Sequence, residues 1–306
     1  MTASFTTAFN ALSDAITVNL RPDPRAYVRI RIWLSVAYAA TSLAGGIAYA
    51  ATDLTLALVL FGSGCFAVAL LATRLPDRAL APRGPATGGL RRRLLDGPAV
   101  ETLRASRALR WILVALALTF FCHVAGYTYL SLRIAASASP SGVGLSGALS
   151  AITEVPVMLI AGSVAERFGL RALFVTGSVL AATASTTCAL TDDVTILLTT
   201  RPVIGASYAC LVVAGVITIR RLLPGELQGT GQALFQSLGF GLAAVVLNLV
   251  GGFIVTAAGD HVLYALTACT ALVGGTIAWR AYGWMDGSGP STRSSALAST
   301  GASERA

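Results

Sequence analysis

Eight apolar stretches, each long enough to cross a lipid bilayer as a helix, constrain this chain more than any other feature. A spanning helix needs about 20 predominantly apolar residues. The stretches are 32–51, 54–73, 109–132, 143–165, 172–191, 194–218, 230–257 and 261–282. Charged residues make up only 12% of the chain, against about 25% in a typical globular protein, and the mean hydropathy is +0.73. The sequence therefore predicts an all-α, polytopic membrane helix bundle and excludes an ordinary soluble protein.

The placement of arginine predicts how the chain sits in the membrane. All 22 basic residues are arginine, and cytoplasmic segments carry the excess of basic residues. The basic segments that would lie on the cytoplasmic side of the membrane are 21–31, 74–110, 166–171, 219–229 and the C-terminal tail. Only Arg133 and Arg201 lie elsewhere. We expect a plasma-membrane protein with a cytoplasmic C-terminus, whose arginines fix topology and meet lipid headgroups; without a soluble domain, no nucleic-acid partner is expected.

One turn carries a recognisable motif. The segment 162–171 reads GSVAERFGLR and fits G-x-x-x-[DE]-R-x-G-x-R. Gly162 would let a neighbouring helix approach closely, and Gly169 suits a tight turn that needs a positive φ. Glu166 and Arg167 are expected to pair with the ends of adjacent helices, and Arg171 to anchor at the headgroups. The motif resembles the loop motif of the major facilitator superfamily. The resemblance implies a gating loop made of Gly162, Glu166, Arg167, Gly169 and Arg171.

Other segments resemble the sugar-efflux and phenylpropionate-permease branch of that superfamily. They are 29–35 (RIRIWLS), 154–162 (EVPVMLIAG) and 222–236 (LLPGELQGTGQALFQ). On this register the eight stretches are helices five to twelve, and the first three helices of the family have no counterpart. The implied domains are 1–73, the remainder of the N-terminal half; 74–108, a basic cytoplasmic linker; 109–283, a six-helix C-terminal half; and 284–306, a disordered tail.

Residues 1–20 leave two interpretations open. Apolar residues recur there at helical spacing, but polar residues, among them Asp14, interrupt them. The segment is either an amphipathic helix at the interface or a polar transmembrane helix, the fourth of the family, that lines a cavity. In the second case Asp14 would complement Arg201 or His123, because an unpaired charge in lipid is costly.

Ionisable residues inside the apolar stretches are the first candidates for a site, since such residues are costly there and usually functional. Glu154 is the best candidate for substrate binding or proton coupling; a structural, hydrogen-bonded carboxyl is the alternative. His123 suits proton exchange, or forms a neutral hydrogen bond between helices. Arg201 partners a carboxylate or an anionic substrate, or extends to the outer interface.

Four uncharged polar residues complete the predicted substrate site. Tyr127 would stack on a sugar or aromatic ring, unless it belongs to an interfacial aromatic belt. Gln232 and Gln236 lie one helical turn apart and share a face. Together with Asn248 they would bind hydroxyl groups, or else hydrogen-bond a neighbouring helix.

The resemblance implies a secondary active transporter that works by proton-coupled alternating access. Its partners would be a small sugar or amphipathic solute, more often exported than imported, and protons. Two alternatives are a proton-coupled aromatic-acid importer and a truncated, non-transporting membrane protein or partner subunit. We expect no enzyme activity, cofactor or metal, because the two histidines, His123 and His261, lie far apart in the topology and the five cysteines lack metal-ligand spacing.

Overall fold

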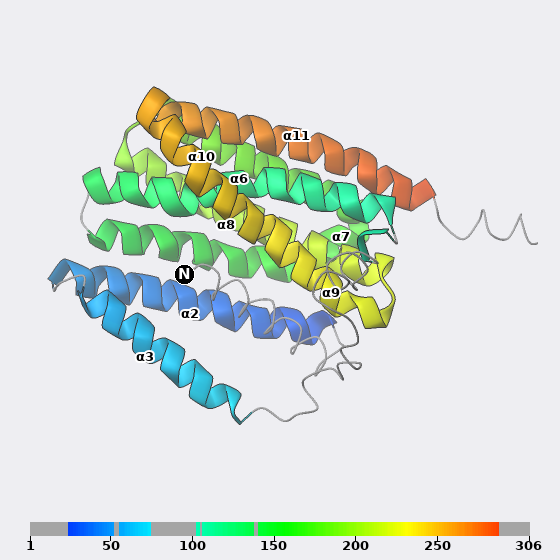
Figure 1. The fold of residues 1–306 in the computed structure, drawn as a ribbon, viewed down its shortest axis with the longest axis horizontal. Coiled ribbons are helices and arrows are strands. Elements are labelled where there is room, and N and C mark those ends of the chain that lie inside the picture. Colours follow the sequence, from blue (N-terminus) through cyan, green and yellow to red (C-terminus); the bar gives the residue numbers. More distant parts are fainter. Residues whose placement is uncertain (1–23, 52–54, 75–101, 105, 138–139, 288–306) are drawn as a thin grey trace, which may run out of the picture.

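Helices account for nearly all of the chain that a computed structural model describes, namely residues 24–51, 55–74, 102–104, 106–137 and 140–287. The helices are α2 (Pro24–Ala51), α3 (Thr55–Ala72), α6 (Arg107–Ser137), α7 (Pro140–Leu190), α8 (Val194–Leu222), α9 (Gly225–Gln236), the π-helical η2 (Ser237–Leu242), α10 (Ala243–Ala258) and α11 (Asp260–Gly287). They lie side by side as an elongated bundle, which α10 crosses obliquely (Figure 1). The predicted all-α class is confirmed. The segment 1–20, most of the linker predicted at 74–108 and the tail beyond 287 lie outside the described residues.

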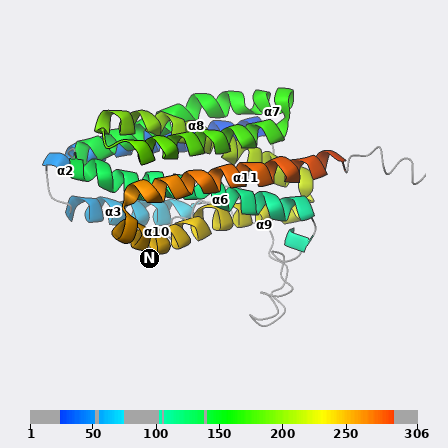
Figure 2. The same ribbon diagram turned by 90° about the horizontal axis from the view of Figure 1, so that it is seen from above.

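Six of the described helices are long and apolar enough to cross a membrane, judged by length and composition. One of them, α7, contains two of the predicted stretches, 143–165 and 172–191, because the chain turns between them at a single residue, Gly169. Its φ of 85° and ψ of 160° lie in a region that is essentially restricted to glycine. Figure 2 shows α7 doubling back on itself. The positive φ expected at Gly169 is therefore confirmed.

The bundle is built around α8, which packs against α6, α7 and α9. Its buried residues recur along its whole length, from Leu197 to Ile219. α11 covers α6 and the second half of the hairpin through α7, and α2 packs against α7. α3 packs against α2 and leaves Leu58 and Phe66 more than 70% exposed. The apolar surface of α3 is what a helix in contact with lipid would present.

Glycines allow α7 and α8 to approach closely, as small residues do at helix contacts in membranes. A Cβ atom at Gly205 would overlap the carbonyl oxygen of Ser150, and one at Gly177 would lie 2.9 Å from the Cγ of Leu211. The close approach expected at Gly162 is not seen, because a Cβ there would meet nothing within 4 Å. The motif glycine of this helix therefore faces open space, and the packing contacts lie elsewhere.

The predicted stretch 230–257 is interrupted by the π-helical turn η2. Phe240 in η2 packs edge-on against Phe120 of α6, with ring centroids 4.3 Å apart, and lies 5.5 Å from the ring of Tyr208 on α8. Such π-helical turns are frequent at functional sites. This one fixes η2 against the two helices that carry His123 and Arg201.

Candidate functional site

Glu154 lies in the interior of the bundle, where α2 meets α7. Its side chain is 7% exposed, and its Oε2 accepts a 2.6 Å hydrogen bond from the hydroxyl of Ser35, which is itself buried. The two residues lie 119 positions apart in the sequence. The bond therefore joins a helix of the predicted N-terminal half to a helix of the predicted C-terminal half.

Arg201 is almost completely buried on α8, at 1% exposure. Its Nε donates to the carbonyl oxygen of Ser146 on α7, over 3.2 Å, and its Nη1 donates to that of Gly126 on α6, over 2.7 Å. A Cβ atom at position 126 would lie 2.9 Å from the Cδ1 of Ile204, whereas its 3.5 Å distance from Nη1 would be an ordinary contact. The structure places Arg201 inside the bundle rather than at the outer interface.

The charge of Arg201 has no close counter-charge among the described residues, none of whose carboxylates lies within 4.0 Å of it. Within the part of the chain that the structure describes, the Arg201 guanidinium is therefore held by backbone carbonyl oxygens and not by a carboxylate.

Tyr127 contacts the buried guanidinium and lies in the neighbourhood of the buried carboxylate. The guanidinium carbon of Arg201 lies 5.3 Å from the centre of the Tyr127 ring, within the range of a cation–π contact. The Tyr127 hydroxyl lies close enough to both Glu154 and Arg201 to interact electrostatically with each. Four helices therefore bring four kinds of side chain into one region: the hydroxyl of Ser35 from α2, the ring of Tyr127 from α6, the carboxyl of Glu154 from α7 and the guanidinium of Arg201 from α8.

His123 is fully buried one helical turn before Tyr127. Its Nε2 lies 3.2 Å from the hydroxyl of Ser207, which donates to the carbonyl oxygen of Gly177 over 2.7 Å. A hydroxyl has one proton to donate, so Nε2 must be the donor to Ser207. The Phe120 ring lies 4.9 Å from the imidazole. This geometry matches the alternative of a histidine hydrogen-bonded between helices, and proton exchange at His123 stays a prediction.

The three predicted amide residues are separated by the structure. Gln232 and Gln236 are buried on α9, whereas Asn248 is exposed on α10. Neither of the hydrogen bonds of Arg201 goes to an amide of this group. Their roles in binding hydroxyl groups stay predictions.

The predicted gating loop lies at the turn inside α7. Glu166 and Arg167 are exposed, and none of the ion pairs among the described residues involves them. Arg171 stacks on the indole of Trp279 in α11, with its guanidinium carbon 3.3 Å from the ring centre. An arginine stacked on a half-exposed tryptophan suits the headgroup region, where tryptophan is enriched.

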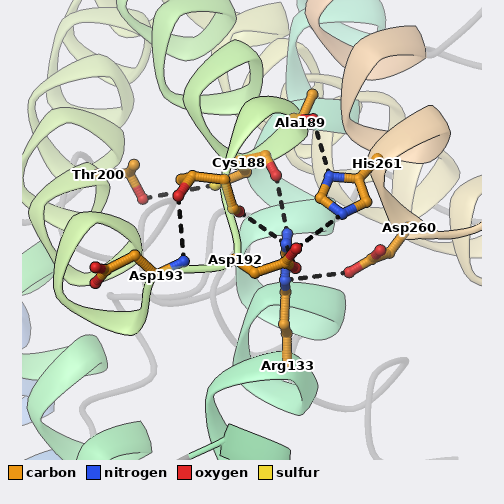
Figure 3. Close-up of polar contacts among 9 residues, drawn as sticks. Arg133, Cys188, Ala189, Asp192, Asp193, Thr200, Asp260 and His261 are labelled. Atoms are coloured by element: carbon orange, nitrogen blue, oxygen red, sulfur yellow. Dashed lines mark hydrogen bonds and ion pairs between the residues drawn. The ribbon is translucent and has the colours of Figure 1, made fainter.

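Two groups of polar residues were not predicted. Ser35 and Ser207 hold Glu154 and His123, and Ser35 is the last residue of the RIRIWLS segment. An ion-pair cluster forms around Arg133, with Asp192, Asp260 and His261 (Figure 3). The short connections that carry Asp192 and Asp260 lie on the same predicted side as Arg133, which is the signal that would have found this cluster.

Comparison with known proteins places these features in a family. The sequence profile of the MFS_1 like family matches residues 1–266. The chain is 31% identical to the maltose permease of Geobacillus stearothermophilus over 79% of its own length and 60% of that protein. It is 26% identical to the putative multidrug resistance protein MdtD of Pectobacterium carotovorum, over 57% of this chain and 38% of that protein. It is 28% identical to the multidrug transporter protein MdtP of Bacillus subtilis, over 42% of this chain and 25% of that protein. The chain thus spans less than two thirds of each of these relatives.

Proposed function

Because the chain belongs to the MFS_1 like family, a family of membrane transporters within the major facilitator superfamily, we propose that it carries the solute and proton site of a secondary active transporter. The observation that supports this most is the hydrogen bond between Ser35 and Glu154, beside Tyr127 and Arg201. Transporters of this kind rock two helical bundles around a site near the middle of the membrane. A buried carboxyl at the contact between α2 and α7 is well placed to couple that motion to a proton.

The coupling step at Glu154 is a change in hydrogen bonding. The ionised carboxylate accepts a hydrogen bond from the Ser35 hydroxyl, whereas a protonated carboxyl also carries an O–H donor of its own. Protonation also removes a negative charge near Arg201 and so leaves the guanidinium freer to attract an acceptor on the solute. Proton binding and solute binding therefore influence one another through Tyr127 and Arg201, as coupled transport requires.

The solute that fits the site best is a small sugar or an amphipathic organic compound. The Tyr127 ring offers a face to stack on, and the guanidinium of Arg201 carries N–H donors beside it. The name of the maltose permease supports a sugar, and the names of the multidrug relatives support an exported amphipathic compound. A second candidate is an anionic aromatic acid, favoured by the lack of a carboxylate within 4.0 Å of Arg201 among the described residues.

The proposed setting is the plasma membrane, with the basic segments and the C-terminus on the cytoplasmic side. The arginine distribution supports this orientation. Lipid headgroups would contact Arg171 and Trp279, whose stacked side chains suit the interface.

Solute counterflow in proteoliposomes tests the proposal and separates binding from coupling. Labelled maltose, a fluorescent amphipathic cation and labelled phenylpropionate serve as probes, each with and without an imposed pH gradient. Glu154→Gln should keep exchange of the transported probe but lose accumulation driven by the gradient. Thr153→Ala, which removes a hydroxyl bonded only to its own helix at Leu149, is the matched control and should keep both. If Glu154→Gln retained gradient-driven accumulation, the assignment of Glu154 would be wrong. If no probe moved with the wild-type protein, the non-transporting alternative would gain support.

A further inference from the structure

Arg133 holds together three elements at the end of the bundle away from the Gly169 turn. From α6, its Nη1 and Nη2 donate to the carbonyl oxygens of Cys188 and Thr191 over 2.8 and 2.7 Å, and Nη2 also bonds to the carboxylate of Asp192. Its Nε lies 3.3 Å from Oδ2 of Asp260, the first residue of α11. Figure 3 shows these contacts converging on one guanidinium. The cluster is thus a built junction between α6, α11 and the turn from α7 to α8.

His261 lies at the edge of this junction, with an acceptor facing each of its ring nitrogens. Nδ1 lies 2.9 Å from the carbonyl oxygen of Ala189, and Nε2 lies 3.4 Å from Oδ2 of Asp192 (Figure 3). A neutral imidazole has one N–H, so it can donate to one of these oxygens while a lone pair faces the other. Only the doubly protonated imidazolium can donate to both. Each of the two acceptors around His261 therefore faces an N–H group only when the ring is charged.

We infer that His261 and Asp192 form a pH-dependent latch that fastens the first turn of α11 to the turn between α7 and α8. When His261 loses a proton, Nδ1 can keep its hydrogen bond to the Ala189 carbonyl, and Nε2 then turns a lone pair toward the Asp192 carboxylate. The ion pair with Asp192 is lost at the same step. Among the described contacts, the start of α11 is then held to that turn by the remaining bond of His261 and by Asp260 through Arg133.

The charges around the latch come from every element packed against it. Arg133 of α6 and Asp260 of α11 pair with each other, and Asp192 is shared by Arg133 and His261. Asp193 is occupied elsewhere, because its carboxylate caps α8 by accepting from the backbone N–H groups of Thr195 and Ile196. The one positive charge of Arg133 therefore faces two carboxylates, and a protonated His261 supplies the second positive charge.

The pH range over which the latch forms depends on the charge states of Asp192 and His261. The hydrogen bond from Arg133 holds the pKa of Asp192 below its usual value, so Asp192 stays ionised into acid. Histidine is the side chain that changes charge between about pH 5 and 8. An ion pair between Asp192 and an imidazolium therefore needs a pH at which histidine is charged, while Asp192 itself limits the ion pair only in strong acid. On the predicted orientation, the latch would sense the pH outside the cell. It does not depend on transport at Glu154.

Hydrogen exchange measured by mass spectrometry tests the latch on the full chain in detergent. Peptides that cover residues 186–195 and 259–266 report on the two fastened turns. After correction for the intrinsic exchange rate, we expect their exchange to be roughly two- to fivefold slower near pH 5.5 than near pH 8, as suits a partly exposed ion pair. His261→Gln should remove this difference, and Asp192→Asn should do the same. Asp193→Asn, whose side chain caps α8 instead, should retain it.

Two results would overturn the latch itself, and a third would contradict the roles given to its residues. One is equal corrected exchange of the wild-type peptides at both pH values. The other is a pH difference that survives in both His261→Gln and Asp192→Asn, since the titrating group would then be another one. A loss of the difference in Asp193→Asn alone would also contradict the assignment.

Discussion

The contact between Gly205 and Ser150 makes a strong prediction about how the site is held. A methyl group at position 205 would overlap the Ser150 carbonyl oxygen, which belongs to the backbone of α7 and cannot rotate away. Overpacking of this kind costs about 1–3 kcal/mol, although alanine regains up to about 1 kcal/mol over glycine in a helix. Gly205→Ala should therefore lower the thermal unfolding midpoint, at about 2–4 °C for each kcal/mol of net destabilisation.

Gly162→Ala is the matched control for this change. The control residue lies in α7 itself, and its added Cβ would meet nothing within 4 Å. Its unfolding midpoint should stay the same or rise. Because Arg201 precedes Gly205 by one turn of α8, Gly205→Ala should also pull Arg201 away from the Ser146 carbonyl and weaken transport. An unfolding midpoint for Gly205→Ala equal to or above that of Gly162→Ala, measured by differential scanning fluorimetry in one detergent, would refute the packing argument.

Two further predictions concern single hydrogen bonds. Ser35→Ala should destabilise the protein by about 1.5–3 kcal/mol if Glu154 is ionised, since hydrogen bonds to charged groups contribute that much. Ser63→Ala on α3 is the control. The Ser63 hydroxyl bonds to the carbonyl of Leu60 in its own helix, so this variant should change the unfolding midpoint little. Equal midpoints for the two variants would contradict a role for Ser35. The pKa of Asp192 is lowered by its bond from Arg133, so the stability it provides is present above the usual aspartate value and is lost as the pH falls through the lowered one. Asp192→Asn should therefore lose less stability than the wild type between pH 7 and strong acid, in unfolding scans at matched salt.

The sequence was sufficient to predict the class of fold and the turn at Gly169. Hydrophobic runs of helix length leave few alternatives in a membrane, because every backbone polar group must be satisfied internally. Gly169 was identifiable because a turn between two closely spaced helices needs a φ that only glycine adopts readily. The close helix approach expected at Gly162 was wrong among the described residues for a related reason, whereas its place in the gating loop stays a prediction. Spacing shows that a glycine lies in a helix, but the neighbours of that glycine depend on the rotation of the helix.

The sequence identified the charged residues of the candidate site but not the serine hydroxyls that contact them. Glu154 and Arg201 stand out because a charge in an apolar stretch is costly. Ser35 does not stand out, since serine is common in membrane helices and its partner lies 119 residues away. The same limit applies to the junction at Arg133, whose partners come from two separate connections. The local sequence pattern identifies charged residues within apolar stretches. Which serine hydroxyls form hydrogen bonds with them depends on how distant helices pack.

Proton movement during transport tests the central proposal most directly. The full protein is reconstituted in weakly buffered liposomes that contain a pH-sensitive dye, and the transported probe is added at equal pH on both sides. The account predicts a pH change inside the liposomes that accompanies solute flux in the wild type and is absent in Glu154→Gln, while that variant still exchanges solute. Solute flux without any pH change in the wild type, or the same pH change in Glu154→Gln, would contradict proton coupling at this carboxyl.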